Sequence, residues 1–270
     1  MVRSRARLAG FLVASVVACL TLATPARAET EVDLALVIAV DVSYSMDLDE
    51  QALQRQGFAE AFRAPQVVDA IRRGFLGRIA VVYFEWAGAN DQRIAVPWTV
   101  LDGPEAIGSF AERVASTPTR RAQRTSISGA IDYGAKLLAE SGFSASRRVI
   151  DVSGDGANNQ GRPVTAAREA AVRAGITVNG LPVMLKAPSY FDIPHLDAYY
   201  RDCVIGGPGA FLVPARDKDQ FREAIKTKIL LEVAGLEPDA SSDARVQPAQ
   251  EAGRADCLAG ETQWQDRMRN

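Results

Sequence analysis

The chain has 270 residues, enough for one or two domains, and its 47% hydrophobic content is typical of a globular protein with a buried core. A charged fraction of 24% and a net charge of −2 exclude the basic field that nucleic-acid binding requires. A single histidine, His195, and three cysteines exclude paired-histidine metal centres and a four-cysteine zinc site. Chemistry in this chain has to depend on carboxylates, hydroxyls and a hard metal ion.

The first 28 residues have the pattern of a signal peptide. Three of the first seven residues are arginine, and the apolar run 8–22 follows them. Ala26 and Ala28 occupy the A-x-A positions of a signal-peptidase site. The run is shorter than the roughly 20 residues that span a bilayer, which favours cleavage after Ala28. A retained anchor and a lipoprotein box at Cys19 are the alternatives.

We therefore expect an exported mature chain, periplasmic or secreted, without a transmembrane segment. Loss of four arginines lowers the number of Lys and Arg from 31 to 27 against 33 acids, a net charge of −6. The mature chain has two cysteines, Cys203 and Cys257, and an oxidising compartment favours their pairing. We predict a disulfide between them that ties the C-terminal tail to the body; two separate thiols are the alternative.

Strand and helix patterns alternate along the chain. Residues 32–42 form a nearly continuous apolar run rich in valine, which is typical of a strand buried on both faces of a parallel sheet. In chain order, the patterns predict strand 32–42, helix 49–62, strands 78–85 and 94–100, helices 104–115 and 126–140, strand 149–153, helix 163–174, strands 176–183 and 211–213, and helix 217–233. Asp49 and Asp217 are predicted helix N-caps, and Gly175 is predicted to end a helix.

This alternation predicts one α/β domain over residues 29–234, with a doubly wound, mostly parallel central sheet flanked by helices. Residues 235–270 are rich in Pro, Ser, Asp, Ala and Gln and show no hydrophobic period. We interpret this segment as a linker and tail that is held only at Cys257.

Small oxygen ligands concentrate in three loops. Asp41, Ser43 and Ser45 follow the first strand, Thr125 opens a helix, and Asp155 follows the fourth predicted strand. The binding crevice of an open α/β sheet lies at the carboxyl ends of its strands, where these loops would meet. Carboxylates and hydroxyls select Mg²⁺, Mn²⁺ or Ca²⁺. Two carboxylates leave little surplus negative charge, so such a site could accept a further anionic oxygen from outside.

The motif Asp-Val-Ser-Tyr-Ser-Met at residues 41–46 resembles the metal-ion-dependent adhesion site of von Willebrand factor type A (vWA) domains. Thr125, in Arg-Thr-Ser-Ile-Ser-Gly, matches the second-loop threonine of that family, and Asp155 matches its third-loop aspartate. The resemblance covers residues 30–234 and is particularly close to exported bacterial vWA-like proteins. The family more often has Thr-Asp-Gly where this chain reads Ser-Gly-Asp-Gly from Ser153.

The resemblance implies that Ser43, Ser45 and Thr125 bind a divalent cation directly, most readily Mg²⁺. Asp41 and Asp155 would act directly or through water, and an Asp or Glu carboxylate of a protein partner would complete the coordination. The function implied is metal-dependent adhesion or protein–protein recognition at the cell envelope, without catalysis and without nucleic acid. The partner and the oligomeric state do not follow from it.

Two other functions fit parts of the sequence. A haloacid-dehalogenase-like phosphatase also begins with an Asp after an apolar strand, but its acid/base aspartate two residues later is here Ser43, and Asn159 stands where its metal loop needs an acid. A structural or solute-binding α/β protein with a degenerate site is the third possibility. Elsewhere, we predict an ion pair or a helix N-terminus beside Asp151 and a short helix beginning at His195.

Overall fold

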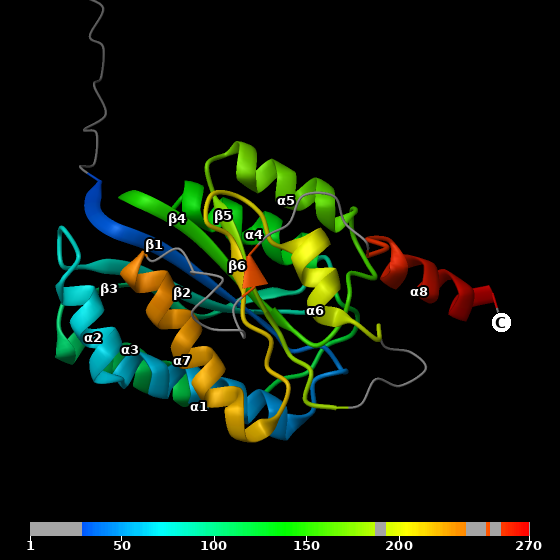
Figure 1. Ribbon diagram of the computed structural model, residues 1–270, viewed down its shortest axis with the longest axis horizontal. Helices are drawn as coiled ribbons and strands as arrows, with labels where there is room; N and C mark the ends of the chain where they lie inside the picture. Colours follow the sequence, from blue (N-terminus) through cyan, green and yellow to red (C-terminus); the bar gives the residue numbers. More distant parts are fainter. Residues whose placement is uncertain (1–28, 187–192, 236–246, 249–254, 270) are drawn as a thin grey trace, which may run out of the picture.

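The computed structural model describes residues 29–186, 193–235, 247–248 and 255–269 (Figure 1). The predicted signal peptide therefore lies outside the described residues. None of the described helices is long and apolar enough to cross a membrane.

A seven-stranded sheet forms the middle layer, in the order β3-β2-β1-β4-β5-β6-β7. Its strands are β1 (Thr30–Asp41), β2 (Ile79–Trp86), β3 (Gln92–Leu101), β4 (Phe143–Gly154), β5 (Thr177–Pro182), β6 (Phe211–Leu212) and β7 (Gln247–Pro248). The five strands from β2 to β6 in this order are parallel, and only the edge strands β3 and β7 are antiparallel. β3 contains Pro97, whose missing N–H an edge strand tolerates. The predicted mostly parallel sheet is confirmed.

Helices cover both faces of the sheet (Figure 1). On one face lie α1 (Leu48–Arg63), α2 (Pro65–Arg72), α3 (Pro104–Ala115) and α7 (Lys218–Ala234). On the other face lie α4 (Ile127–Ala139) and α5 (Val164–Arg173). Alternate side chains of β1 enter the two cores: Leu34 and Leu36 pack against the first group, Ala35 and Val37 against the second. Burial on both faces is the reason for the continuous apolar run in the sequence.

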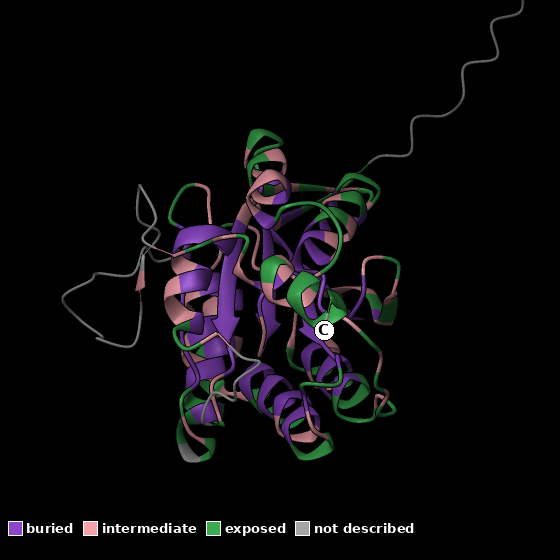
Figure 2. Ribbon diagram, turned by 90° about the vertical axis from the view of Figure 1, so that its right-hand side faces the viewer, coloured by how far each residue is buried: buried purple, intermediate pink, exposed green. Residues whose placement is uncertain are grey.

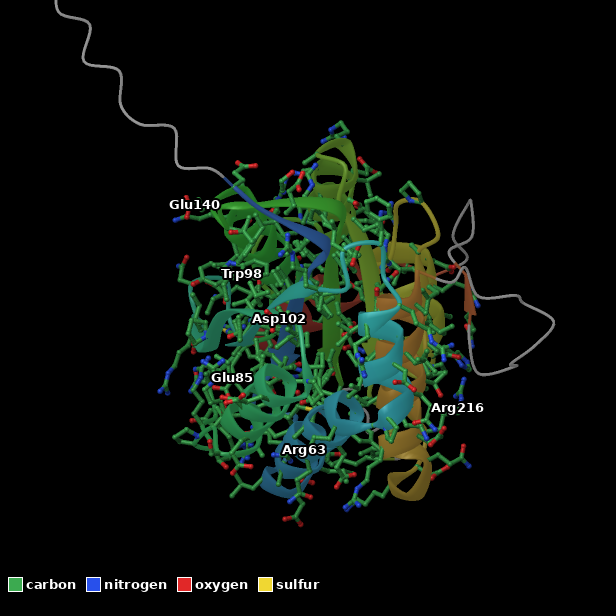
Figure 3. The ribbon with its side chains drawn as sticks, turned by 90° about the vertical axis from the view of Figure 1, so that its left-hand side faces the viewer. Arg63, Glu85, Trp98, Asp102, Glu140 and Arg216 are labelled. Atoms are coloured by element: carbon green, nitrogen blue, oxygen red, sulfur yellow. A yellow bond between two sulfur atoms is a disulfide. The ribbon has the colours of Figure 1, made fainter. Side chains whose placement is uncertain are left out.

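Charged side chains lie on the outer faces of these helices. The Arg63 guanidinium at the end of α1 lies 2.6 Å from the Glu112 carboxylate of α3, at the solvent-facing surface (Figure 3). Inside the molecule, the predicted ion pair of Asp151 is confirmed, because Lys228 Nζ of α7 lies 2.9 Å from its Oδ1.

The cap of α1 is one correction to the sequence-based expectation. The cap is Asp47, not Asp49: Asp47 Oδ1 accepts a hydrogen bond from the Glu50 backbone N–H at 2.8 Å, and Glu50 Oε2 accepts one from the Asp47 N–H at 2.9 Å. Asp47 has a glutamate three residues later and Asp49 has Ala52, so only Asp47 can form this reciprocal capping box.

The other predicted helix ends are confirmed. Asp217 accepts a hydrogen bond from Gln220 N at 2.7 Å at the start of α7, and Gly175 has a φ of +72° after α5. α6 (Leu196–Tyr199) begins after His195 as expected and continues into the π-helical turn η1 (Tyr200–Val204). The predictions missed α2, whose short apolar pattern begins at Pro65.

The C-terminal segment contains a helix that the composition did not predict. This helix, α8 (Ala259–Arg269), lies in front of the strand ends in Figure 2 and is largely exposed beyond its first turn. The interpretation of this segment as a linker and tail did not include a helix, because α8 is mostly polar and is positioned by a few specific contacts rather than by an apolar face. The predicted disulfide Cys203–Cys257 is present. It joins η1 to Cys257, two residues before α8 begins. The domain boundary near residue 234 remains a prediction.

Candidate metal site at the strand ends

The first loop of the site begins where β1 ends, at the buried Asp41. The backbone N–H of Ser43 donates to Asp41 Oδ1 at 2.7 Å, so the chain turns tightly around this carboxylate. Ser43 Oγ lies 2.8 Å from Ser45 Oγ, and Ser45 Oγ donates to Asp155 Oδ1 at 2.6 Å. Four of the five predicted ligands therefore form one connected chain of contacts across two loops. β1 and β4 are neighbours in the sheet, and the chain connections that follow them lead to opposite sides of the sheet. Ligands of such sheets usually bind in the crevice that forms at this point.

The second loop is fixed to the end of β2 by an ionic contact and to the first loop by a backbone hydrogen bond. Arg120 Nε lies 2.9 Å from the buried Glu85 carboxylate at the end of β2, and Ala122 N donates to Val42 O at 3.0 Å. Burial raises the pKa of Glu85, and the Arg120 guanidinium opposes that shift. These contacts place Thr125 beside the first loop.

Thr125 is also paired with the third loop. Its N–H donates to Asn159 Oδ1 at 3.0 Å, and Asn159 N donates back to Thr125 O at 2.8 Å. Thr125, Ser43 and Ser45 line one hollow of about 370 Å³. The structure thus brings all five residues predicted as metal ligands to one end of the sheet.

The approach of β4 to Asp41 requires a glycine. A Cβ built on Gly154 would lie 2.8 Å from Asp41 Oδ2 and 3.0 Å from the Tyr200 hydroxyl. This close packing gives a reason for the Ser-Gly-Asp-Gly sequence, in which the chain departs from the more frequent Thr-Asp-Gly.

The donor set fits a hard divalent cation. Asp41 Oδ2 is buried and has no hydrogen-bond partner among the described residues, an arrangement that costs free energy unless a cation faces it. Burial raises the pKa of Asp41 well above its usual value, and the negative charge of Asp155 raises it further. The described residues contain no cluster of three or more His, Cys, Asp or Glu side chains that could hold a metal, so a cation here would depend on the hydroxyls.

Residues of α8 border this site, which the sequence did not predict. Glu261 Oε1 accepts a hydrogen bond from Asn158 Nδ2 at 2.7 Å, and a Cβ on Gly260 would overlap the Asn158 carbonyl oxygen. Trp264 lines the hollow beside Thr125, and the Arg124 guanidinium lies 3.5 Å from the centre of its ring. An isolated tryptophan in a polar segment carries no signal that separates such a position from an ordinary surface one.

Solved structures with a related fold include an adhesin, a matrix protein and a von Willebrand factor type A structure. The pilus adhesin SpaC from Lactobacillus rhamnosus GG superposes with a TM-score of 0.57 at 10% identity, over 76% of this chain and 31% of its own. Proximal thread matrix protein 1 from the mussel byssus gives 0.52 at 15% identity, over 76% and 49%. A von Willebrand factor type A structure from Catenulispora acidiphila gives 0.51 at 14% identity, over 75% and 43%.

The chain thus spans between a third and a half of the length of these proteins, and the likeness establishes a vWA fold. No curated protein matches the sequence. One protein family, described as "Protein of unknown function (DUF1194)", matches residues 31–237, which is most of the chain. The chain belongs to this DUF1194 family and has the vWA fold.

Proposed function

We propose that this protein recognises a protein partner by a divalent-cation-dependent contact with a carboxylate of that partner, and that it has no catalytic role. One observation carries the proposal: Asp41, Ser43, Ser45, Thr125 and Asp155, which come from three loops, converge beside a buried carboxylate oxygen without a hydrogen-bond partner among the described residues. A cation held there would supply the positive charge that attracts an anionic oxygen from outside.

The hydroxyl and carboxylate residues of the site would have different roles in holding the cation. Ser43, Ser45 and Thr125 would hold the cation by neutral hydroxyl oxygens, and Asp41 and Asp155 would supply two negative charges. Two charges balance a divalent ion without exceeding it, so an additional carboxylate remains attractive to the site. Mg²⁺ suits this small oxygen set best, with Mn²⁺ or Ca²⁺ as other hard ions.

The non-catalytic assignment has support from one position and from the related folds. Ser43 cannot replace the acid/base aspartate that a phosphatase of the haloacid-dehalogenase type needs there. SpaC and the mussel protein are named as an adhesin and a matrix protein, which agrees with recognition. We further propose export to the cell envelope after cleavage of residues 1–28, the same setting in which the disulfide is stable.

A carboxylate probe tests this function. We would measure binding of a fluorescent pentapeptide, Gly-Gly-Glu-Gly-Gly, to the purified protein in Mg²⁺ and in EDTA. Asp41→Ala should lose at least tenfold in affinity and keep its circular dichroism spectrum. Asp102→Ala is the matched control, because Asp102 is exposed after the antiparallel strand β3 (Figure 3), at the other end of the sheet. Binding that is indifferent to EDTA, or retained in Asp41→Ala, would contradict the proposal.

A further inference from the structure

We propose that the partner segment carries a second acidic side chain, which binds Arg124 and Arg267 beside the metal site, and that α8 is part of the recognition surface. This inference rests on the proposed function and specifies its partner as an acidic peptide segment with two carboxylates. The site would then bind one carboxylate at the cation and the other at the arginines.

Two hollows border the metal loops, and Trp264 contributes to the lining of both. One has a volume of about 310 Å³ and the other about 370 Å³, and both are lined by Ser45, Thr125 and Trp264. Among the described residues that line them, the charged side chains are Arg124 and Arg267, and none is a carboxylate. A ligand carboxylate at the cation therefore has positive side chains as its nearest charged neighbours in these hollows.

Arg124 has the geometry of a residue held in place for binding. Its φ of +75° is the only positive value for a non-glycine among the described residues, a conformation that costs free energy and that the surrounding loop maintains. Its guanidinium stacks 3.5 Å from the centre of the Trp264 ring. Stacking occupies the face of the guanidinium and leaves its N–H edge, which matches a carboxylate in two parallel hydrogen bonds.

Two acidic side chains near this surface have partners within the protein. Asp47 lies 3.3 Å from Lys186 Nζ, and Glu261 accepts its hydrogen bond from Asn158. Arg124 forms no hydrogen bond or ion pair with another described side chain, and the Arg267 guanidinium lies 5.6 Å from the centre of the Trp264 ring. The Arg124 guanidinium therefore supplies a positive charge to a ligand beside the metal loops, and Arg267 lines the same hollow.

Several contacts fix α8, and with it Trp264, against the metal loops. The disulfide Cys203–Cys257 attaches the chain two residues before α8, and Gly260 allows the first turn to touch the Asn158 carbonyl oxygen. Any larger residue at Gly260 would displace the helix. The position of α8 is thus specified at its N-terminal end, and Trp264 and Arg267 follow on the same helix and line the hollows.

Paired peptides test this inference. Side chains two residues apart in an extended peptide lie on the same side, about 7 Å apart, so the probes are fluorescent Gly-Glu-Gly-Glu-Gly and Gly-Glu-Gly-Gln-Gly in Mg²⁺, both with an amidated C-terminus so that the only carboxylates are those of the glutamates. We expect the diacid to bind at least tenfold more tightly, well beyond the twofold statistical advantage of its second carboxylate. The double variant Arg124→Gln/Arg267→Gln should reduce this preference, which is the ratio of the two peptide affinities in the same protein, to about twofold.

Two further variants separate the explanations. Gly260→Ala, which displaces α8, should reduce the preference in the same way, and Arg173→Gln, on an exposed residue at the end of α5, should preserve it. A preference of twofold or less in the unmodified protein, or a tenfold preference that survives in Arg124→Gln/Arg267→Gln, would overturn the second acidic contact while leaving the proposed function intact. Failure of both peptides to bind in Mg²⁺ would overturn the proposed function itself. Tighter binding of a trigalacturonate than of the diacid peptide would overturn the assignment of a protein partner.

Discussion

At the scale of single residues, the candidate site depends on how closely Gly154 approaches Asp41. The missing Cβ lets the end of β4 pack against Asp41 Oδ2, and Asp155 follows directly on the same strand end. Any side chain at position 154 has to displace either the carboxylate or the third loop.

Gly154→Ala is therefore expected to weaken Mg²⁺ binding at least tenfold, which corresponds to about 1.4 kcal/mol. Gly108→Ala is the matched control, because a Cβ on Gly108 meets nothing within 4 Å inside α3. It should leave the metal affinity unchanged and raise the free energy of unfolding by up to about 1 kcal/mol. Calorimetric titration and urea unfolding of both variants measure these effects. Equal Mg²⁺ affinity in the two variants would refute the role of Gly154.

A second residue-scale feature is the buried ionic cluster behind the sheet. Lys228 Nζ lies 2.9 Å from both Asp151 Oδ1 and Glu232 Oε1, and Asn179 donates to Glu232 at 2.7 Å. One cation faces two carboxylates, so the cluster has surplus negative charge. Burial raises the pKa of Asp151 to about 6, although Lys228 opposes that shift and Glu232 adds to it.

This shift predicts a pH dependence of stability. The unfolded chain protonates an aspartate near pH 3.9, so Asp151 takes up a proton on folding between about pH 4 and 6. Its contribution to stability is present below the unfolded pKa and is lost as the pH rises through the folded pKa, a change of up to about 3 kcal/mol. Urea unfolding in EDTA should show this loss in the unmodified protein and a smaller slope in Asp151→Asn. The same slope in both proteins would contradict the assignment.

At the scale of elements, the helices and strands with strong patterns were predictable and α8 was not. The apolar run of β1 and the alternation of strands and helices follow directly from burial of the sheet on both faces. The grouping of Asp41, Ser43, Ser45 and Asp155 was predictable because they follow two strand ends that meet at one edge. Thr125 was predicted to join them because its loop resembles the second loop of the vWA motif. Trp264 and Arg267 were not, because their helix is polar and its position depends on the disulfide and on the fit of one glycine.

The disulfide is therefore expected to control α8 rather than the metal site. The double variant Cys203→Ser/Cys257→Ser should increase amide hydrogen exchange across residues 259–269 at least tenfold and leave Mg²⁺ binding unchanged. Alkylation of the unreduced protein followed by intact-mass measurement should find no free thiol on these two cysteines. Two alkylated thiols, or unchanged exchange in the variant, would show that α8 is held by other means.

At the scale of the whole molecule, one end of the sheet carries all the groups assigned to recognition. The carboxyl ends of β1 and β4 supply the aspartates, the loop between α3 and α4 supplies Thr125, and α8 adds Trp264 beside them (Figure 1). The buried ionic cluster lies between α7 and the strands β4 and β5. Under the proposed function, this end of the sheet faces the partner, and the rest of the fold holds its loops in place.

The central claim is that Asp41 and the three loops hold a divalent cation. Isothermal titration of the EDTA-treated protein with Mg²⁺, in an acetate buffer that supplies the external carboxylate, tests this claim most directly when Asp41→Ala is measured beside it. We expect saturable binding at one site per chain, which Asp41→Ala abolishes without loss of helix content. No binding to the unmodified protein, or equal binding to Asp41→Ala, would contradict it.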